Sequence, residues 1–192
     1  MIIPNMLLVG STARNTGKTT FCTEFINKWH ETYKIIGVKI TTIHDENCHC
    51  HYGDKGCGAC TLFCGDYEIV EEVNISGSKD TSGLIRAGAA KVLWVRAKKW
   101  RLDEAAERVM AMISNDAVVV CESNSLSEVV SPGTIVVTHR SGVKEIKPSA
   151  LPMLEKADFI VDISDPESLK TALDSIYIVF SEGRVRLTSK SN

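Results

Sequence analysis

A short run near the N-terminus places a glycine, a lysine and two threonines in an order that suits phosphate chemistry: Gly17-Lys18-Thr19-Thr20. A glycine lets the backbone approach anionic oxygens, and successive N–H groups of such a loop can donate to them. Lys18 can reach terminal phosphates, and the Thr19 hydroxyl is a potential Mg²⁺ ligand. The run therefore predicts a site for a nucleoside triphosphate with Mg²⁺.

The flanking residues place this run between a strand and a helix. Residues 6–9 are continuously apolar, and residues 18–32 have helical spacing. Thr12 stands where the usual spacing of such loops has a glycine, and Gly10 comes too early to replace it. We predict that the nucleotide is held by eight consecutive residues: Ala13, Arg14, Asn15, Thr16, Gly17, Lys18, Thr19 and Thr20.

Two acidic residues are candidates for work near the Mg²⁺ and the attacking water. Glu122 directly follows the apolar residues 117–121, so it should emerge at the carboxyl end of a buried strand. Asp45 lies just beyond a second predicted strand, residues 33–40, and should emerge at the same edge of the sheet. His44 and Glu46 are equally plausible neighbours there, and a solvated charge at a strand end is the alternative for each carboxylate. We predict Lys18, Asp45 and Glu122 as catalytic residues.

Five of the chain's seven cysteines crowd into residues 48–64. The spacing includes a C-x-C pair and a C-x-x-C pair, and glycines between them would let the backbone wrap a metal centre. Four thiolates suit an iron–sulfur cluster or a structural zinc, and spacing alone does not choose. Iron–sulfur is favoured, because a zinc knuckle would leave a fifth thiol unexplained. The candidate ligands are Cys48, Cys50, Cys57, Cys60 and Cys64, of which four would bind and Cys57 and Cys60 are safest.

Other interpretations of this segment stay open. His49 and His51 are possible ligands, and a flexible loop with free thiols is the plain alternative. Exposed free cysteines are prone to oxidation, so a chain that keeps five together is expected to use them. Cys22 and Cys121 lie alone in apolar stretches and are expected to be small core residues.

Size and composition describe an ordinary globular chain. It has 192 residues and a formal net charge of −2, so composition gives no reason to propose nucleic acid or a membrane surface as partner. No apolar run approaches the roughly 20 residues of a membrane-spanning helix, and the N-terminal residues lack the basic start of a secretory signal. We expect a cytoplasmic protein made of one domain, residues 1–192, with a cysteine-rich insertion at about residues 44–66.

Apolar strands alternate with helical patterns along the chain, which predicts an α/β fold with a mostly parallel sheet flanked by helices. Ligands then gather at the carboxyl ends of the strands. A short helix is expected at 80–88, capped by Asp80 or Thr81. The chain should end in a hairpin. Further strands are expected at 67–75, 91–96, 134–138 and 158–163, and further helices at 102–113, 148–156 and 167–176.

The order of these motifs resembles that of a known family. The glycine-lysine-threonine loop, the His44-Asp45 pair and the run Gly77-Ser78-Lys79-Asp80-Thr81-Ser82-Gly83-Leu84-Ile85-Arg86-Ala87-Gly88-Ala89 are similar to the MobB-type molybdopterin-guanine dinucleotide biosynthesis GTPases. These belong to the SIMIBI class of P-loop NTPases. Their Val-Glu-Gly corresponds here to Cys121-Glu122-Ser123, and the resemblance covers roughly residues 6 to 125. It implies that Thr19, Asp45 and Glu122 position Mg²⁺ and water.

The chain departs from that family at three points. MobB-type proteins do not usually carry the cysteine segment, and the guanine-reading Asn-Lys-x-Asp is absent near residues 158–165. GTP is favoured over ATP by the resemblance, but both stay open. The lysine that marks the nitrogenase-iron-protein branch would fall at Ala13. Its neighbour Arg14 is interpreted as a loop residue on the phosphates, with an intersubunit finger as the alternative.

The resemblance also implies a homodimer that helps to insert or mature a metal cofactor. We therefore interpret the chain as an NTPase that cleaves the β–γ phosphoanhydride and serves a client metalloenzyme or a cofactor-assembly protein. A nucleotide-gated iron–sulfur electron-transfer protein and a non-catalytic adapter with structural zinc are the alternatives. A small-molecule kinase is disfavoured, because no arginine-rich lid is visible.

Overall fold

The computed structural model describes residues 1–43, 63 and 65–189. Its centre is a seven-stranded sheet in the order β3-β4-β2-β5-β1-β6-β7. Every neighbouring pair is parallel except β3–β4. The strands are β1 (Ile2–Ser11), β2 (Ile35–Ile43), β3 (Tyr67–Glu71), β4 (Lys91–Lys98), β5 (Val118–Glu122), β6 (Ser131–His139) and β7 (Phe159–Asp162).

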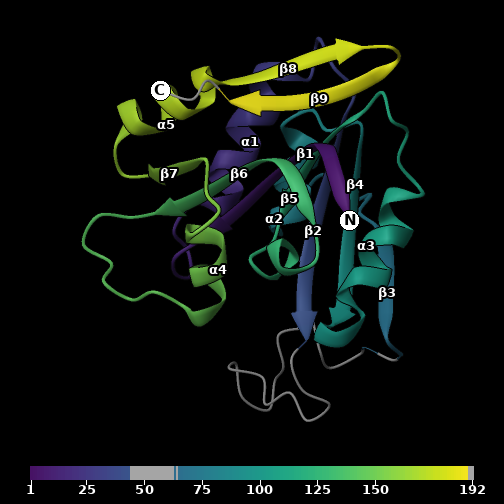
Figure 1. The fold of residues 1–192 in the computed structure, drawn as a ribbon, viewed down its shortest axis with the longest axis horizontal. Coiled ribbons are helices and arrows are strands. Elements are labelled where there is room, and N and C mark those ends of the chain that lie inside the picture. Colours follow the sequence, from purple (N-terminus) through teal and green to yellow (C-terminus); the bar gives the residue numbers. More distant parts are fainter. Residues whose placement is uncertain (44–62, 64, 190–192) are drawn as a thin grey trace.

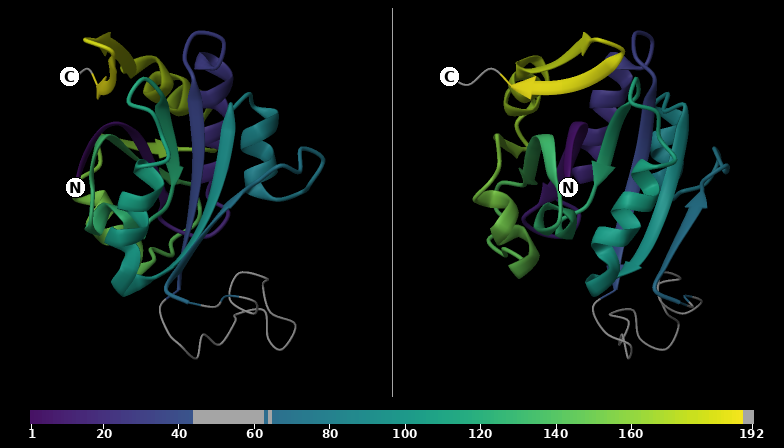
Figure 2. Two further views of the ribbon diagram at one scale, coloured as in Figure 1. Left: turned by 90° about the vertical axis from the view of Figure 1, so that its right-hand side faces the viewer. Right: turned by 45° about the vertical axis from the view of Figure 1, so that its right-hand side comes forward.

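Helices cover both faces of this sheet (Figures 1 and 2). One face packs against the first two helices and the last one, and the opposite face packs against the third and fourth. The central strands are buried on both sides, which explains their unbroken apolar runs. The helices are α1 (Lys18–Trp29), α2 (Asp80–Arg86), α3 (Leu102–Met110), α4 (Leu151–Leu154) and α5 (Pro166–Ser175).

An antiparallel pair of strands, β8 (Ile176–Ser181) and β9 (Arg184–Ser189), follows the last helix. Its inward residues Ile176, Val185 and Leu187 are buried in the same cluster as the inner side of α1. The pair lies at the end of the molecule where the strands begin, opposite the carboxyl edge of the sheet (Figure 1). The pair therefore covers one end of the core and stays away from the carboxyl edge of the sheet, where polar residues follow the strands.

The predicted α/β architecture with a mostly parallel sheet is confirmed, and the differences lie at element ends. The predicted strand 67–75 stops at Glu71, because the Asn74 side chain accepts from Ser76 N at 3.1 Å and turns the chain. The predicted helix 148–156 is a 3₁₀ turn followed by the short α4, with prolines in both. The longest described helix, α1, has 12 residues, and none of those described qualifies as a membrane span.

Candidate functional site

The loop of residues 12–17 connects β1 to α1 at the carboxyl edge of the sheet. Two of its residues have left-handed backbones, Asn15 with φ 54° and Gly17 with φ 91°. Two hydrogen bonds to the loop's backbone stabilise its conformation. The hydroxyls of Ser11 and Thr16 both donate to the Ala13 carbonyl, at 2.8 and 2.9 Å. Such a turn at a helix N-terminus directs N–H groups toward one point and suits an anion.

Thr12 and Gly10 explain the unusual spacing of this loop. Thr12 continues the ladder between β1 and β6, with its N–H donating to Thr138 O at 3.0 Å, and its backbone is not left-handed. A glycine is therefore not required at position 12. At Gly10, an added Cβ would lie 2.2 Å from the Met153 sulfur, so glycine there allows α4 to pack against β1.

Gly17 is the position in the loop where a side chain should cost most. A Cβ would require the strained φ of 91° and would lie 2.4 Å from Ile163 Cγ1. We expect Gly17→Ala to lower the free energy of unfolding by about 2–3 kcal/mol, measured by urea denaturation. Gly142→Ala is the matched control, because its φ of 86° imposes similar strain but its Cβ would meet nothing within 4 Å. Equal losses in the two variants would show that the Ile163 contact does not matter.

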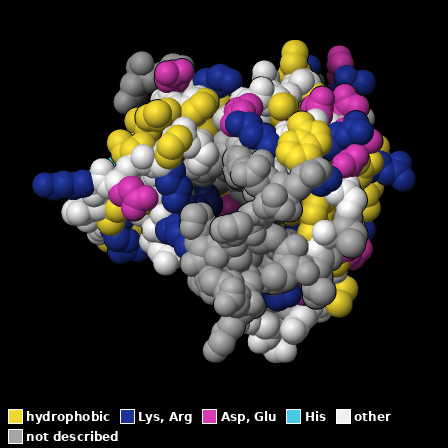
Figure 3. All heavy atoms as spheres, turned by 90° about the horizontal axis from the view of Figure 1, so that it is seen from below, with side chains coloured by type: hydrophobic (Ala, Val, Ile, Leu, Met, Phe, Trp, Pro, Cys, Tyr) yellow, Lys and Arg dark blue, Asp and Glu magenta, His cyan; other side chains and the backbone are white. Residues whose placement is uncertain are grey.

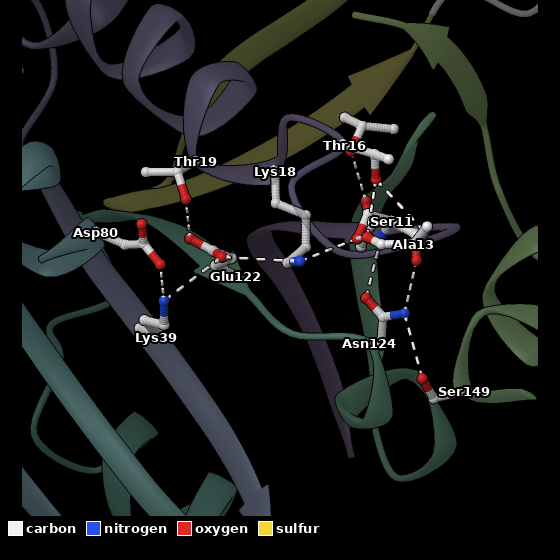
Figure 4. A network of polar contacts seen from close by, with 12 residues as sticks. Ser11, Ala13, Thr16, Lys18, Thr19, Lys39, Asp80, Glu122, Asn124 and Ser149 are labelled. Atoms are coloured by element: carbon white, nitrogen blue, oxygen red, sulfur yellow. Dashed lines mark hydrogen bonds and ion pairs between the residues drawn. The ribbon is translucent and has the colours of Figure 1, made fainter. Parts of the chain in front are cut away.

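Lys18, Thr19 and Glu122 meet at the start of α1 (Figure 4). The Thr19 hydroxyl donates to Glu122 Oε2 at 2.9 Å, and Lys18 Nζ lies 4.0 Å from Glu122 Oε1. Lys18 Nζ also donates to Ser11 Oγ at 2.9 Å. Glu122 is only 4 % exposed, at the end of a strand that pairs with β1. The pairing of β5 with β1 therefore brings together the lysine and the carboxylate that the sequence predicted.

A second ion pair adjoins this cluster. Lys39 on β2 pairs with Asp80 at the start of α2, and its Nζ lies 3.8 Å from Glu122 Oε1. The sequence predicts Asp80 or Thr81 as the cap of α2, but Lys79 is the N-cap residue and no side-chain cap hydrogen bond forms there. The pair with Lys39 holds the Asp80 carboxylate toward the site instead (Figure 4).

A pocket of 230 Å³ lies beside this cluster. Of the eight predicted nucleotide-binding residues, the six from Asn15 to Thr20 line it, together with Asp80, Glu122 and Arg140. Ala13 is buried within the loop, and Arg14 lines a neighbouring pocket. Asp45, His44 and the five candidate metal ligands, Cys48, Cys50, Cys57, Cys60 and Cys64, lie outside the described residues.

Asn124 fixes the loop from the other side. Its amide oxygen accepts from Ser11 N at 2.9 Å, and its amide nitrogen donates to Ser11 O at 2.8 Å. The same nitrogen lies 3.4 Å from Ser149 Oγ. With both of these bonds made to Ser11, the Asn124 amide holds the end of β1 in place.

Sequence reasoning missed four residues of the site: Ser11, Lys39, Asp80 and Arg140. Lys39 offered the clearest signal, because a charged residue inside an otherwise buried apolar strand needs a partner. Its partner Asp80 lies 41 residues further along the chain, so no local pattern joins the two. Arg140 follows the end of β6, which the sheet order places beside β1.

Cys22 and Cys121 are core residues, as the sequence predicted. Both are 0 % exposed, and burial raises the pKa of each thiol well above its usual value, with the nearby Glu122 carboxylate adding to the effect. A neutral, buried thiol neither alkylates nor binds metal readily.

We therefore expect iodoacetamide at pH 8 to leave Cys22 and Cys121 unmodified in the native protein. Peptide mass spectrometry should detect their modification only after unfolding. Since the chain has seven cysteines, any label on the native protein then belongs to the other five. Rapid native labelling of either buried thiol would contradict the packing described for α1 and β5.

A cluster of cationic side chains and aromatic rings lies on β4, beside Phe63. The Arg96 guanidinium lies 5.0 Å from the Trp94 ring and 5.7 Å from the Phe63 ring, and it pairs with Glu68. Trp94 Nε1 donates to Thr41 Oγ1 at 3.0 Å. Lys79, the neighbour of Asp80, lies 5.3 Å from the same indole. The cluster thus connects the start of α2 with the strands on either side of residues 44–62.

Within residues 1–43, 63 and 65–189, no group of three or more His, Cys, Asp or Glu could hold a metal ion. The fold and the site together define an α/β protein with a polar pocket at the carboxyl edge of a mostly parallel sheet. No family model, curated protein or solved structure matches the chain.

Proposed function

We propose that the chain is a P-loop NTPase of the SIMIBI class, similar to the MobB-type GTPases, that binds and hydrolyses GTP or ATP. Its task would be metallocofactor assembly in the cytoplasm, as a homodimer that serves a client metalloprotein. One observation carries the nucleotide part of this proposal. The Thr19 hydroxyl and the Lys18 ammonium lie 2.9 and 4.0 Å from the Glu122 carboxylate, beside a loop whose backbone suits an anion.

The chain's own residues would divide the work as follows. Backbone N–H groups of residues 13–19 and the Lys18 ammonium would hold the phosphates and offset the charge that develops on the γ-phosphate. Ser11 positions Lys18 through the hydrogen bond of 2.9 Å between Oγ and Nζ. Glu122 would orient the attacking water, because its carboxylate is buried at the end of β5 beside Lys18.

The oxygen donors in the pocket fit a hydrated Mg²⁺. A hydroxyl and a carboxylate, on Thr19 and Glu122, lie 2.9 Å apart, and Asp80 lines the same pocket. Mg²⁺ typically uses one or two carboxylates and completes its shell with waters and substrate phosphates. When bound, it would neutralise charge on the β- and γ-phosphates. Asp45 stays a further proposed ligand.

Calorimetric titration of the purified protein with GTP and ATP, with and without Mg²⁺, tests this part. We expect a dissociation constant in the micromolar range for at least one triphosphate and release of inorganic phosphate that requires Mg²⁺. The nucleotide that binds more tightly identifies the base. Absence of binding at millimolar concentrations of both would overturn the nucleotide proposal.

The cysteine segment is proposed to carry an iron–sulfur cluster, or zinc as the alternative. Anaerobic purification followed by an absorption spectrum and analysis of iron, sulfide and zinc separates the two. Iron with sulfide supports a cofactor-assembly factor, and a reversible one-electron signal would favour electron transfer. Tight zinc with negligible turnover would favour an adapter.

Coupling between nucleotide and metal is the second part of the proposed function. It is supported by the Lys79–Asp80 dipeptide, which contacts both the Trp94 cluster and Lys39. We expect the spectrum or metal occupancy to change when nucleotide binds, and Cys57→Ser to alter hydrolysis or partner binding. A metal centre indifferent to nucleotide, together with a silent Cys57→Ser variant, would disprove the coupling.

A further inference from the structure

A second pocket, of 360 Å³, adjoins the first across Lys18 and Glu122. The two pockets share Asn15, Lys18, Asp80 and Glu122. In Figure 4, Lys18 lies between the Thr19–Glu122 pair and the chain of contacts formed by Ser11, Asn124 and Ser149. A nucleotide held along residues 15–20 would thus leave the space on the Asn124 side available to another small molecule, for which this volume is sufficient.

Positive charge dominates the described lining of this second pocket. It contains Arg14, Lys18, Lys39 and Lys147 but only two carboxylates, Asp80 and Glu122. Lys39 is engaged with both carboxylates. Figure 3, which views the carboxyl edge of the sheet, shows Lys and Arg side chains along one side of a hollow, with an acidic side chain inside it.

Lys147 lines this pocket and not the first. Burial lowers the pKa of its ammonium, and the charges of Lys18 and Arg14 lower it further against the opposing effect of Glu145. Its backbone is fixed, since Lys147 N donates to Thr12 O at 2.8 Å. A cation held in place beside other cations is stabilised by an anion that binds between them.

The remaining wall is also rigid, and the Ser149 hydroxyl is a polar group on it. Ser123 N donates to Val9 O at 3.1 Å, and Asn124 is bonded to the backbone of Ser11 in both directions. Ser149 Oγ lies 3.4 Å from the Asn124 amide nitrogen and lines the pocket with Lys147. Lysine, arginine and serine are the groups that bind phosphates and carboxylates in proteins.

We propose that this pocket binds the anionic group, phosphate or carboxylate, of a small organic ligand, next to the γ-phosphate position and on the opposite side of Lys18 from the nucleotide. The proposal rests on the proposed function for the order of the two ligands, and it deepens that function by assigning the site a second ligand class. Lys147 and Ser149 would contact the anion, and Lys18 would face both ligands.

The test uses the full-length protein saturated with a non-hydrolysable triphosphate analogue and Mg²⁺, so that the γ-phosphate position is filled. Inorganic phosphate and citrate are then titrated separately by calorimetry. We expect one of them to bind with millimolar or tighter affinity. Phosphate alone would indicate phosphorylated ligands, and citrate alone would indicate organic carboxylates. Failure of both to bind at 10 mM would overturn the proposal.

Substitutions of single lysines test whether the anion binds in the second pocket. We expect Lys147→Gln to weaken the anion about tenfold while changing the analogue's dissociation constant less than threefold. Lys144→Gln, on an exposed residue of the same connection, is the matched control and should change neither. Anion binding that is unaffected by Lys147→Gln, or that occurs only without the analogue, would place the anion elsewhere and disprove the proposal.

The same titrations of the nucleotide-free protein separate the two hypotheses. If the analogue does not bind but phosphate or citrate binds and is lost in Lys147→Gln, the nucleotide proposal fails and the anion site stands. If the analogue binds and depends on Lys18 but neither anion binds beside it, the anion site fails and the nucleotide site stands.

Discussion

Glu122→Gln is expected to lower the turnover of the Mg²⁺–triphosphate complex by about 10²- to 10³-fold, while the nucleotide's dissociation constant stays within about threefold. Glutamine keeps the shape and an oxygen that can accept from Thr19, which now donates at 2.9 Å. It removes the negative charge that would polarise the attacking water. It also removes a repulsion against the phosphates, which offsets the weaker hold of an amide oxygen on Mg²⁺, so binding should change little.

The fold should tolerate this change. Glu122 is buried, but Lys39 keeps its pair with Asp80 and Lys18 keeps its bond to Ser11 when the carboxylate becomes an amide. Glu128→Gln is the matched control, because Glu128 follows in the next segment and pairs with the surface residue Lys99 at 3.2 Å. Phosphate release and calorimetry measure the two quantities. Unchanged turnover in Glu122→Gln with normal binding would remove Glu122 from the mechanism.

The central strands could be predicted because a strand buried on both faces needs an unbroken run of apolar residues. Residues 117–121 are continuously apolar, and the middle strand β5 spans Val118–Glu122. The ends of strands were harder to predict where polar residues continue the pairing with a neighbouring strand. Thr41 and Thr42 ended the predicted second strand at residue 40, but the ladder with β4 continues to Ile43.

The order of the strands in the sheet could not be predicted from the sequence. β5 lies between β1 and β2, although it comes after four other strands in the chain. That order decides the site, because it puts Glu122 directly beside the end of β1. The pairing of Lys39 with Asp80 depends in the same way on α2 packing over β2. Local sequence patterns identified residues whose side chains could bind or catalyse. The strand order of the sheet determines which of them lie together.

A lysine in the proposed nucleotide pocket should differ from a surface lysine in what its removal costs, and α1 carries one of each. Lys18 lies between Ser11 and Glu122 in the pocket, and Lys28, near the other end of the same helix, pairs with the exposed Asp174 at 2.7 Å. Surface ion pairs of the second kind contribute little to stability. Replacing each lysine by alanine therefore separates a binding role from a general effect of charge.

We expect Lys18→Ala to weaken triphosphate binding about 100-fold and Lys28→Ala to leave it unchanged. Two charge-assisted contacts to the β- and γ-phosphates of about 1.5 kcal/mol each give about 3 kcal/mol, which corresponds to that factor. Binding of the diphosphate should suffer less, because one of these contacts is absent from it. Calorimetry with both nucleotides measures the difference. Equal effects of the two variants on the triphosphate would show that Lys18 acts only through net charge.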